Sequence, residues 1–157
     1  MIIYIAILSI LTVVIINATF GAIRSFAEFR VSRDLNTSAF SVMERLTREI
    51  RSAYAIDINQ SSFDVSPGRL TLQKKDSGGA ESTVEFYVEN NSLKIKESGI
   101  LIGALISSST RMDNFTVRSL SNPNSNAIKA EVTLTASRGG ISKTGNFYST
   151  AILRGSY

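Results

Sequence analysis

The chain has 157 residues, no cysteine, no histidine and a formal net charge of +4. Without cysteine and histidine it has no disulfides, no thiolate or imidazole metal ligands, and no nucleophile–base pair that needs histidine. The basic excess of 17 Lys and Arg over 13 Asp and Glu is small and spread along the chain, which indicates a solvated surface more than a site for nucleic acid.

The amino-terminal segment, Met1 to Ile23, carries no charged side chain. About 20 apolar residues at about 1.5 Å rise cross a hydrocarbon core of about 30 Å, so this segment is long enough to span a membrane. Its Ser9 and Thr12 hydroxyls can bond back to helix carbonyls. Three interpretations are open: a cleaved secretory signal, a single-pass anchor, and a segment that sits first in lipid and later packs against copies of itself. The absence of a basic residue before the apolar run argues against the signal.

An amphipathic helix is predicted over residues 24–55, where no proline or glycine interrupts the pattern. The apolar residues of its second part recur at helical spacing; they are Leu35, Ala39, Val42, Met43, Leu46, Ile50 and Ala53. Ion pairs at i,i+4 spacing are expected for Glu44 with Arg48, Arg45 with Glu49, and Arg30 with Asp34. A helix continuous from Met1 to Ala55 would measure about 80 Å. The remaining residues cannot bury a rod of that length, so its first half must find lipid or other subunits.

Charged and aromatic side chains follow the apolar segment. The charged ones are interpreted as inter-subunit contacts, as a stripe of arginines that faces an anion, or as a solvated surface; they are Arg24, Glu28, Arg30 and Arg33. The aromatic ones are interpreted as inter-subunit contacts, core residues or membrane-interface anchors; they are Phe20, Phe26 and Phe29.

Short alternating runs after Tyr54 predict strands separated by turns. The expected strands cover residues 69–73, 83–88, 93–96, 114–118, 130–135 and 147–153. Glu89 to Ser92 should form a hairpin turn, and Ile100 to Ile106 a buried connection. Strands that follow a single helix predict an α+β fold, in which a small antiparallel sheet over residues 66–157 covers the apolar face of the helix. The chain thus divides into an apolar segment, 1–23, and a globular domain, 24–157.

No motif for phosphate, dinucleotide or zinc binding and no catalytic triad is found, so the chain is interpreted as neither an enzyme nor a cofactor-binding or metal-binding protein. Asp64, Asp113 and Asn114 have the oxygen ligands that a Ca²⁺ site uses, but ordinary turn formation explains them more simply.

The overall arrangement resembles the type IV pilin and pseudopilin family, across essentially the whole chain. Residues 40–53 (FSVMERLTREIRSA) are similar to the helix of J-type pseudopilins and related minor pilins. Residues 90–96, 105–110 and 114–118 are similar, in this order, to the sheet segments of that family.

The resemblance implies that a prepilin peptidase removes a leader, that the given chain starts at the mature residue, and that Met1 is a site of N-terminal methylation. Two positions depart from the family pattern. Ile5 stands where the family usually has a glutamate that pairs with the terminal amine of a neighbour. Ala22 stands where many pilins have a proline; if the helix loosens in a filament, the expected place is Asn17 to Gly21.

The function implied by the resemblance is that of a structural subunit of a type IV pilus-like filament, which polymerises through its apolar helix. The residues expected to pack in the filament core are Met1, Ile5, Leu8, Leu11, Ile15 and Phe20. Expected partners are copies of the chain, the pilus assembly machinery and, before assembly, the bacterial inner membrane; the final location is an extracellular filament. The alternatives are a minor pseudopilin of a type II secretion-type system and a monomeric membrane-tethered binding domain. DNA binding is a further alternative, which a steep dependence of affinity on salt would reveal.

Overall fold

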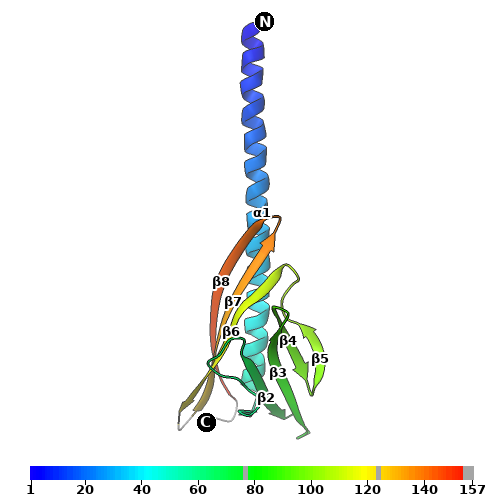
Figure 1. Ribbon diagram of the computed structural model, residues 1–157, viewed down its shortest axis with the longest axis vertical. Helices are drawn as coiled ribbons and strands as arrows, with labels where there is room; N and C mark the ends of the chain where they lie inside the picture. Colours follow the sequence, from blue (N-terminus) through cyan, green and yellow to red (C-terminus); the bar gives the residue numbers. More distant parts are fainter. Residues whose placement is uncertain (76–77, 123–124, 154–157) are drawn as a thin grey trace.

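The computed structural model describes residues 1–75, 78–122 and 125–153 (Figure 1). Its first element is α1, Ile2–Ser52, an uninterrupted helix of 51 residues. Figure 1 shows α1 as a long rod: the first half projects alone, and the second half lies against the strands. The fold is therefore α+β, as predicted.

Two antiparallel sheets accompany the second half of α1. The first sheet has the order β1-β2-β3-β4-β5, and the second has the order β6-β7-β8. The strands of the first are β1 (Ala55–Ile56), β2 (Arg69–Lys75), β3 (Glu81–Glu89), β4 (Ser92–Glu97) and β5 (Ile100–Ala104). Those of the second are β6 (Thr110–Asn122), β7 (Ser125–Arg138) and β8 (Ile141–Ile152).

The expectation of one sheet was wrong, and strand length supplies a physical reason. Strands β6 to β8 have 12 to 14 residues, which span roughly 40–45 Å at about 3.3 Å per residue. The helix from Arg24 to Ser52 measures about 43 Å. The long sheet thus matches the part of α1 from Arg24 to Ser52 in length. Of all the strands, β8 and β7 make the most contacts with α1. The shorter strands, with 9 residues at most, cannot match that length and form a separate sheet.

The apolar face predicted for the helix is confirmed. Leu35, Ala39, Val42, Leu46 and Ile50 are buried, whereas Met43 is only partly buried. The predicted end at Ala55 was three residues too late, because Ala53 already has extended backbone angles, φ −76° and ψ 142°. The backbone N–H of Tyr54 then donates to the carbonyl of Gln73, which begins the pairing of β1 with β2. Strand structure therefore starts at residue 55 rather than 66, and residues 154–157 of the predicted sheet region lie outside the described residues.

A series of hydroxyl contacts joins α1 to the strands on both sides of its apolar face. Ser38, which is buried, donates to Thr110 at 3.2 Å, and the hydroxyl oxygens of Thr47 and Ser149 are 3.0 Å apart. Gly145 on β8 faces the helix: a Cβ there would lie 3.3 Å from the Leu35 side chain and 3.0 Å from the Phe147 ring. A residue without a side chain therefore lets β8 approach the helix closely.

Ion pairs join the first sheet to α1, in addition to the apolar residues of β2, β3 and β4 that share the core with the helix. Glu49 is buried, and its carboxylate contacts Lys74 Nζ on β2 at 2.6 Å and Arg45 Nε at 2.9 Å. The contact with Arg45 Nε is ionic rather than a directed hydrogen bond. Arg45 also bonds Glu97 on β4 through its terminal nitrogen. Glu49 thus links the helix to β2, and its neighbour Arg45 links the helix to β4.

Backbone hydrogen bonds join the two sheets. The N–H of Gly68 donates to the carbonyl of Phe115 on β6 at 2.7 Å, and the N–H of Asp64 donates to Val117 at 2.9 Å. A Cβ at Gly68 would lie 3.0 Å from the Phe115 oxygen, so the absence of a side chain permits this approach.

The expectation that Ile100 to Ile106 forms a buried connection was largely wrong. Residues 100–104 form the edge strand β5, where Ile100, Leu101 and Ile102 are 50–69% exposed. Ile106 is buried in the core, and Leu105 packs against it. A continuous apolar run can be an edge strand or a core connection, and the sequence pattern does not separate them.

We predict that Glu49→Ala lowers the free energy of unfolding by about 2–3 kcal/mol. Removing one partner of a buried ion pair typically costs about 3–5 kcal/mol. Here Arg45 and Lys74 keep 27% and 28% exposure and recover part of their hydration. Urea unfolding of the full chain in detergent micelles measures the change. Glu44→Ala, at an exposed position on the same helix, should change stability by less than about 0.5 kcal/mol; equal losses would contradict the anchoring role of Glu49.

We also predict that Gly21→Ala stabilises the middle of α1. No atom lies within 4 Å of a Cβ at Gly21, so only backbone entropy changes, by roughly 1 kcal/mol. Amide hydrogen exchange over residues 17–25 should slow about fivefold in the full chain in micelles. Ala22→Gly is the reciprocal control and should accelerate exchange in the same residues. An unchanged rate in both variants would contradict the prediction.

Candidate functional site

The apolar half of α1 is the largest uncovered apolar surface of the described chain. Every residue from Met1 to Ile23 is exposed, including fifteen large apolar side chains whose exposure runs from 48% to 97%. By length and composition α1 is suited to cross a membrane, and none of its most apolar stretch is buried. The segment therefore requires an apolar environment that this chain does not supply.

The serine and threonine hydroxyl groups of this segment are internally satisfied. Ser9, Thr12 and Thr19 each donate to the carbonyl four residues earlier at 2.8 Å, as expected for Ser9 and Thr12. These side chains consequently bring no unpaired donor into a hydrocarbon environment, where an unpaired polar group costs several kcal/mol.

The residues expected in a filament core lie largely on one side of α1. At 100° per residue, Met1, Ile5, Leu8, Leu11 and Ile15 fall within about 120° of one another. Phe20 lies to the side of this group. By the same geometry, the mean direction of the group is roughly opposite the face that α1 buries against the strands. All six residues are exposed in the single chain, and their packing in a filament stays a prediction.

Asn17 and Gly21, where loosening is expected in a filament, both lie inside the uninterrupted helix. The single chain thus holds these residues in a helical conformation, and the expectation about the filament stays a prediction.

The charged residues that follow the apolar segment are exposed to solvent. Arg24 Nε contacts Glu28 Oε1 at 3.4 Å, and these side chains are 79% and 53% exposed. Arg30 and Arg33 are exposed and have no ion-pair partner among the described residues. The expected pair of Arg30 with Asp34 was wrong, because Asp34 instead faces the β6–β8 sheet: it accepts a hydrogen bond from Ser109 at 3.2 Å and lies 3.9 Å from Arg138.

Of the other two expected ion pairs, one is confirmed. Arg45 contacts Glu49 at 2.9 Å, whereas Arg48 lies 3.8 Å from Glu49 rather than beside Glu44. Arg48 thus approaches the buried carboxylate of Glu49, and Glu44 stays exposed.

Core packing is excluded for Phe26 and Phe29, which are 69% and 67% exposed. Phe20 is likewise 67% exposed. The interpretations that stay open for these rings are contact with other subunits and contact with lipid.

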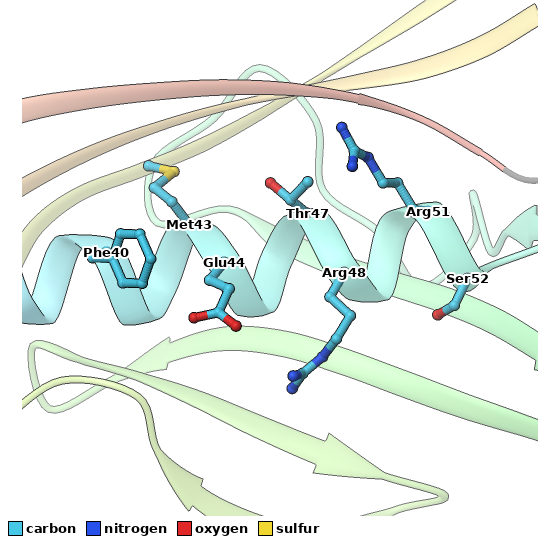
Figure 2. A pocket seen from close by; sticks show the side chains of 7 residues that line it. All are labelled: Phe40, Met43, Glu44, Thr47, Arg48, Arg51 and Ser52. Carbon is cyan, nitrogen blue, oxygen red and sulfur yellow. The ribbon is translucent and has the colours of Figure 1, made fainter.

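A shallow hollow on the second half of α1 was not anticipated from the sequence (Figure 2). It is lined entirely by one helix, by Phe40, Met43, Glu44, Thr47, Arg48, Arg51 and Ser52. Phe40 is 70% exposed, and in Figure 2 Arg48 and Arg51 extend to different sides of the helix. An open helical face with an aromatic side chain and flanking charges suits contact with another protein more than enclosure of a small molecule.

The described residues contain no group of three or more Asp or Glu side chains that could hold a metal ion. The oxygen ligands considered for Ca²⁺ have other partners: Asp64 lies 3.4 Å from Arg118, Asp113 lies 2.7 Å from Arg111, and Asn114 accepts a hydrogen bond from Thr116.

Two carboxyl groups, those of Glu89 and Glu131, have shifted pKa values for local reasons. A hydrogen bond from Lys94 lowers the pKa of Glu89, and one from Lys129 lowers the pKa of Glu131. Both are surface ion pairs between neighbouring strand residues, and neither lies in a cleft with a reactive partner.

Comparisons of the chain with models of protein families, with characterised proteins and with solved structures give no match. The functional argument therefore depends on the geometry of this chain.

Proposed function

We propose that this chain is a structural subunit of a type IV pilus-like filament, which polymerises through residues 1–23 of α1. The observation that carries the proposal is that one unbroken helix is wholly exposed and uncharged in its first half and folded into a domain in its second half. The resemblance to pilins and pseudopilins adds the assembly pathway: leader removal by a prepilin peptidase, methylation of Met1 and extraction from the membrane by an assembly machine.

The free-energy cost of exposing this half of α1 to water is larger than the folding stability of the domain. Fifteen large apolar side chains are exposed there, and burial of each is worth about 1.5–3 kcal/mol, on the order of 20–40 kcal/mol together. A domain of this size is stable by about 5–15 kcal/mol. The apolar half must consequently be covered, by lipid before assembly and by copies of itself in the filament.

The filament core offers an environment like the one that the membrane provided. Transfer from lipid to a bundle of apolar helices gives little hydrophobic driving force, so assembly requires work from outside. Ile5 leaves the chain without the carboxylate that the family pairs with a neighbour's amine. Shape complementarity of the apolar side chains then has to align the subunits.

The direct test is to shear intact cells and to examine the released material by electron microscopy and intact-mass analysis. Fibres that contain this chain support the proposal. If the chain stays in the membrane fraction and no fibre contains it, the filament proposal is overturned in favour of a tethered binding domain. Short fibres formed only with an overproduced secretion system would instead indicate a minor pseudopilin.

We predict that Leu8→Arg abolishes filaments and leaves the globular domain folded. A charge at this position would lie inside the apolar bundle, and even at the centre of a lipid-exposed helix it costs about 2.5–3.5 kcal/mol. Filament yield after shearing and protease resistance of the domain are measured together. Leu8→Met, which conserves volume, should assemble normally. Normal filaments from Leu8→Arg would refute the packing role, and a membrane-fraction assay shows whether that variant still inserts.

A further inference from the structure

The tip of the β7–β8 hairpin lies beside the part of α1 that directly follows the apolar half. Arg138 and Gly139 share a hollow with Ile23, Phe26 and Arg30. Figure 1 shows that this tip is the part of the strand region nearest to the projecting half of the helix. The hairpin therefore places residues from the far end of the chain at the level where the uncharged segment ends.

The tip is tied to the helix, so this level is set by the fold. Lys143 Nζ donates to Ser32 Oγ at 2.7 Å, and Gly140, Ser142 and Lys143 line a hollow with Arg24. Gly139 and Gly140 have φ values of +57° and +79°, a backbone conformation that glycine adopts readily and that closes a tight hairpin. No side chain extends from the turn, and its backbone can approach a flat surface closely.

Cationic side chains gather at this level from both elements. We call them the basic collar; they are Arg24, Arg30, Arg33, Arg138 and Lys143. Two carboxylates lie among them: Glu28, 3.4 Å from Arg24, and Asp34, 3.9 Å from Arg138. The five cations outnumber the two carboxylates, and the collar keeps a positive excess.

The length of the apolar segment, residues 1–23, determines which layer of a membrane the basic collar would contact. Residues 1–23 measure about 35 Å as a helix and fill a hydrocarbon core of about 30 Å. Arg24 then lies just outside the core, and Arg30 lies about 9 Å further along the axis. A headgroup layer is roughly 5–8 Å thick on each side. Arg24 and the hairpin tip beside it are thus at headgroup depth, and Arg30 and Arg33 lie just beyond the headgroups, within about one Debye length of their charge. Phe26 and Phe29 are exposed between these two levels.

We propose that the basic collar is a docking surface for anionic lipid headgroups, used while the subunit waits in the membrane. This rests on the membrane-inserted stage of the proposed function. Each Lys or Arg near an anionic surface favours docking by about fivefold, and the effect weakens within a Debye length and with salt. Lipid contact on both the helix and the hairpin tip would hold the domain at a defined height and tilt before assembly.

The test uses the full chain in phosphatidylcholine vesicles with and without phosphatidylglycerol. Because the chain has no cysteine, Ser142→Cys accepts a single fluorophore at the hairpin tip. Spin-labelled lipid headgroups quench the fluorophore when the tip lies among them. We expect strong quenching with phosphatidylglycerol and weak quenching without it or in high salt. A fluorophore at Asn59→Cys, in the loop after β1, should be quenched in neither vesicle.

Charge variants connect the quenching to the collar. Arg138→Gln with Lys143→Gln should lower the docking equilibrium by about 30-fold, roughly fivefold for each charge. Arg138→Lys with Lys143→Arg should retain it. The matched control is Arg51→Gln with Lys129→Gln, which removes one arginine and one lysine near the other end of the domain. It should leave quenching unchanged. Circular dichroism verifies that each variant is folded.

The possible failures are distinguishable. If the chain inserts but quenching is the same with and without phosphatidylglycerol, or is insensitive to the collar variant, the docking proposal is overturned and the filament proposal stands. A chain that does not float with vesicles overturns the membrane stage and the docking proposal together. Quenching that appears only at high protein density, and is lost on dilution in the membrane, would assign the collar to contact with a second copy and would also overturn lipid docking.

Discussion

The continuity of α1 is the constraint on which the rest of the structure depends. One helix of 51 residues joins an apolar half, which is unstable in water, to a half that packs in a folded domain. Since no break separates them, any partner that covers the first half also sets the position of the domain. This rigid connection keeps the hairpin tip beside the end of the apolar half, and it sets the predicted packing side of that half roughly opposite the strands.

The second half of α1 is held by two different kinds of interaction. The β6–β8 sheet runs along the helix and packs through apolar side chains, with hydroxyl contacts such as Ser38 with Thr110. The β1–β5 sheet touches the helix less and is attached through Glu49, whose carboxylate contacts Arg45 and Lys74. Apolar packing along a helix does not specify position along its axis well, whereas a buried ion pair requires particular partners. The charged contact therefore adds a specific pairing to the apolar contacts through which β2, β3 and β4 share the core.

Many of the polar groups in the described residues have structural partners rather than reactive ones. Glu49 anchors a sheet, Asp34 accepts a hydrogen bond from Ser109, and Asp113 pairs with Arg111. The described surfaces that stay uncovered are of another kind: the apolar half of α1, the helix hollow around Phe40, the apolar side chains of β5, and Arg30 and Arg33 of the basic collar. Exposed surfaces of this type bind other macromolecules or lipid, and this pattern supports an assembling protein.

The sequence by itself determined the helix, its buried face and most strand positions, because these depend on local periodicity. Leu35, Ala39, Val42, Leu46 and Ile50 repeat at helical spacing, and the alternating runs repeat at strand spacing. The division into two sheets, the exposure of β5 and the burial of Glu49 were decided by tertiary structure. Each depends on which distant residues meet, such as Lys74 with Glu49, and no local pattern encodes that. The same holds for the collar. Three of its five residues, Arg24, Arg30 and Arg33, follow the apolar segment in sequence, but Arg138 and Lys143 join them only because β7 and β8 are as long as the part of the helix beside them.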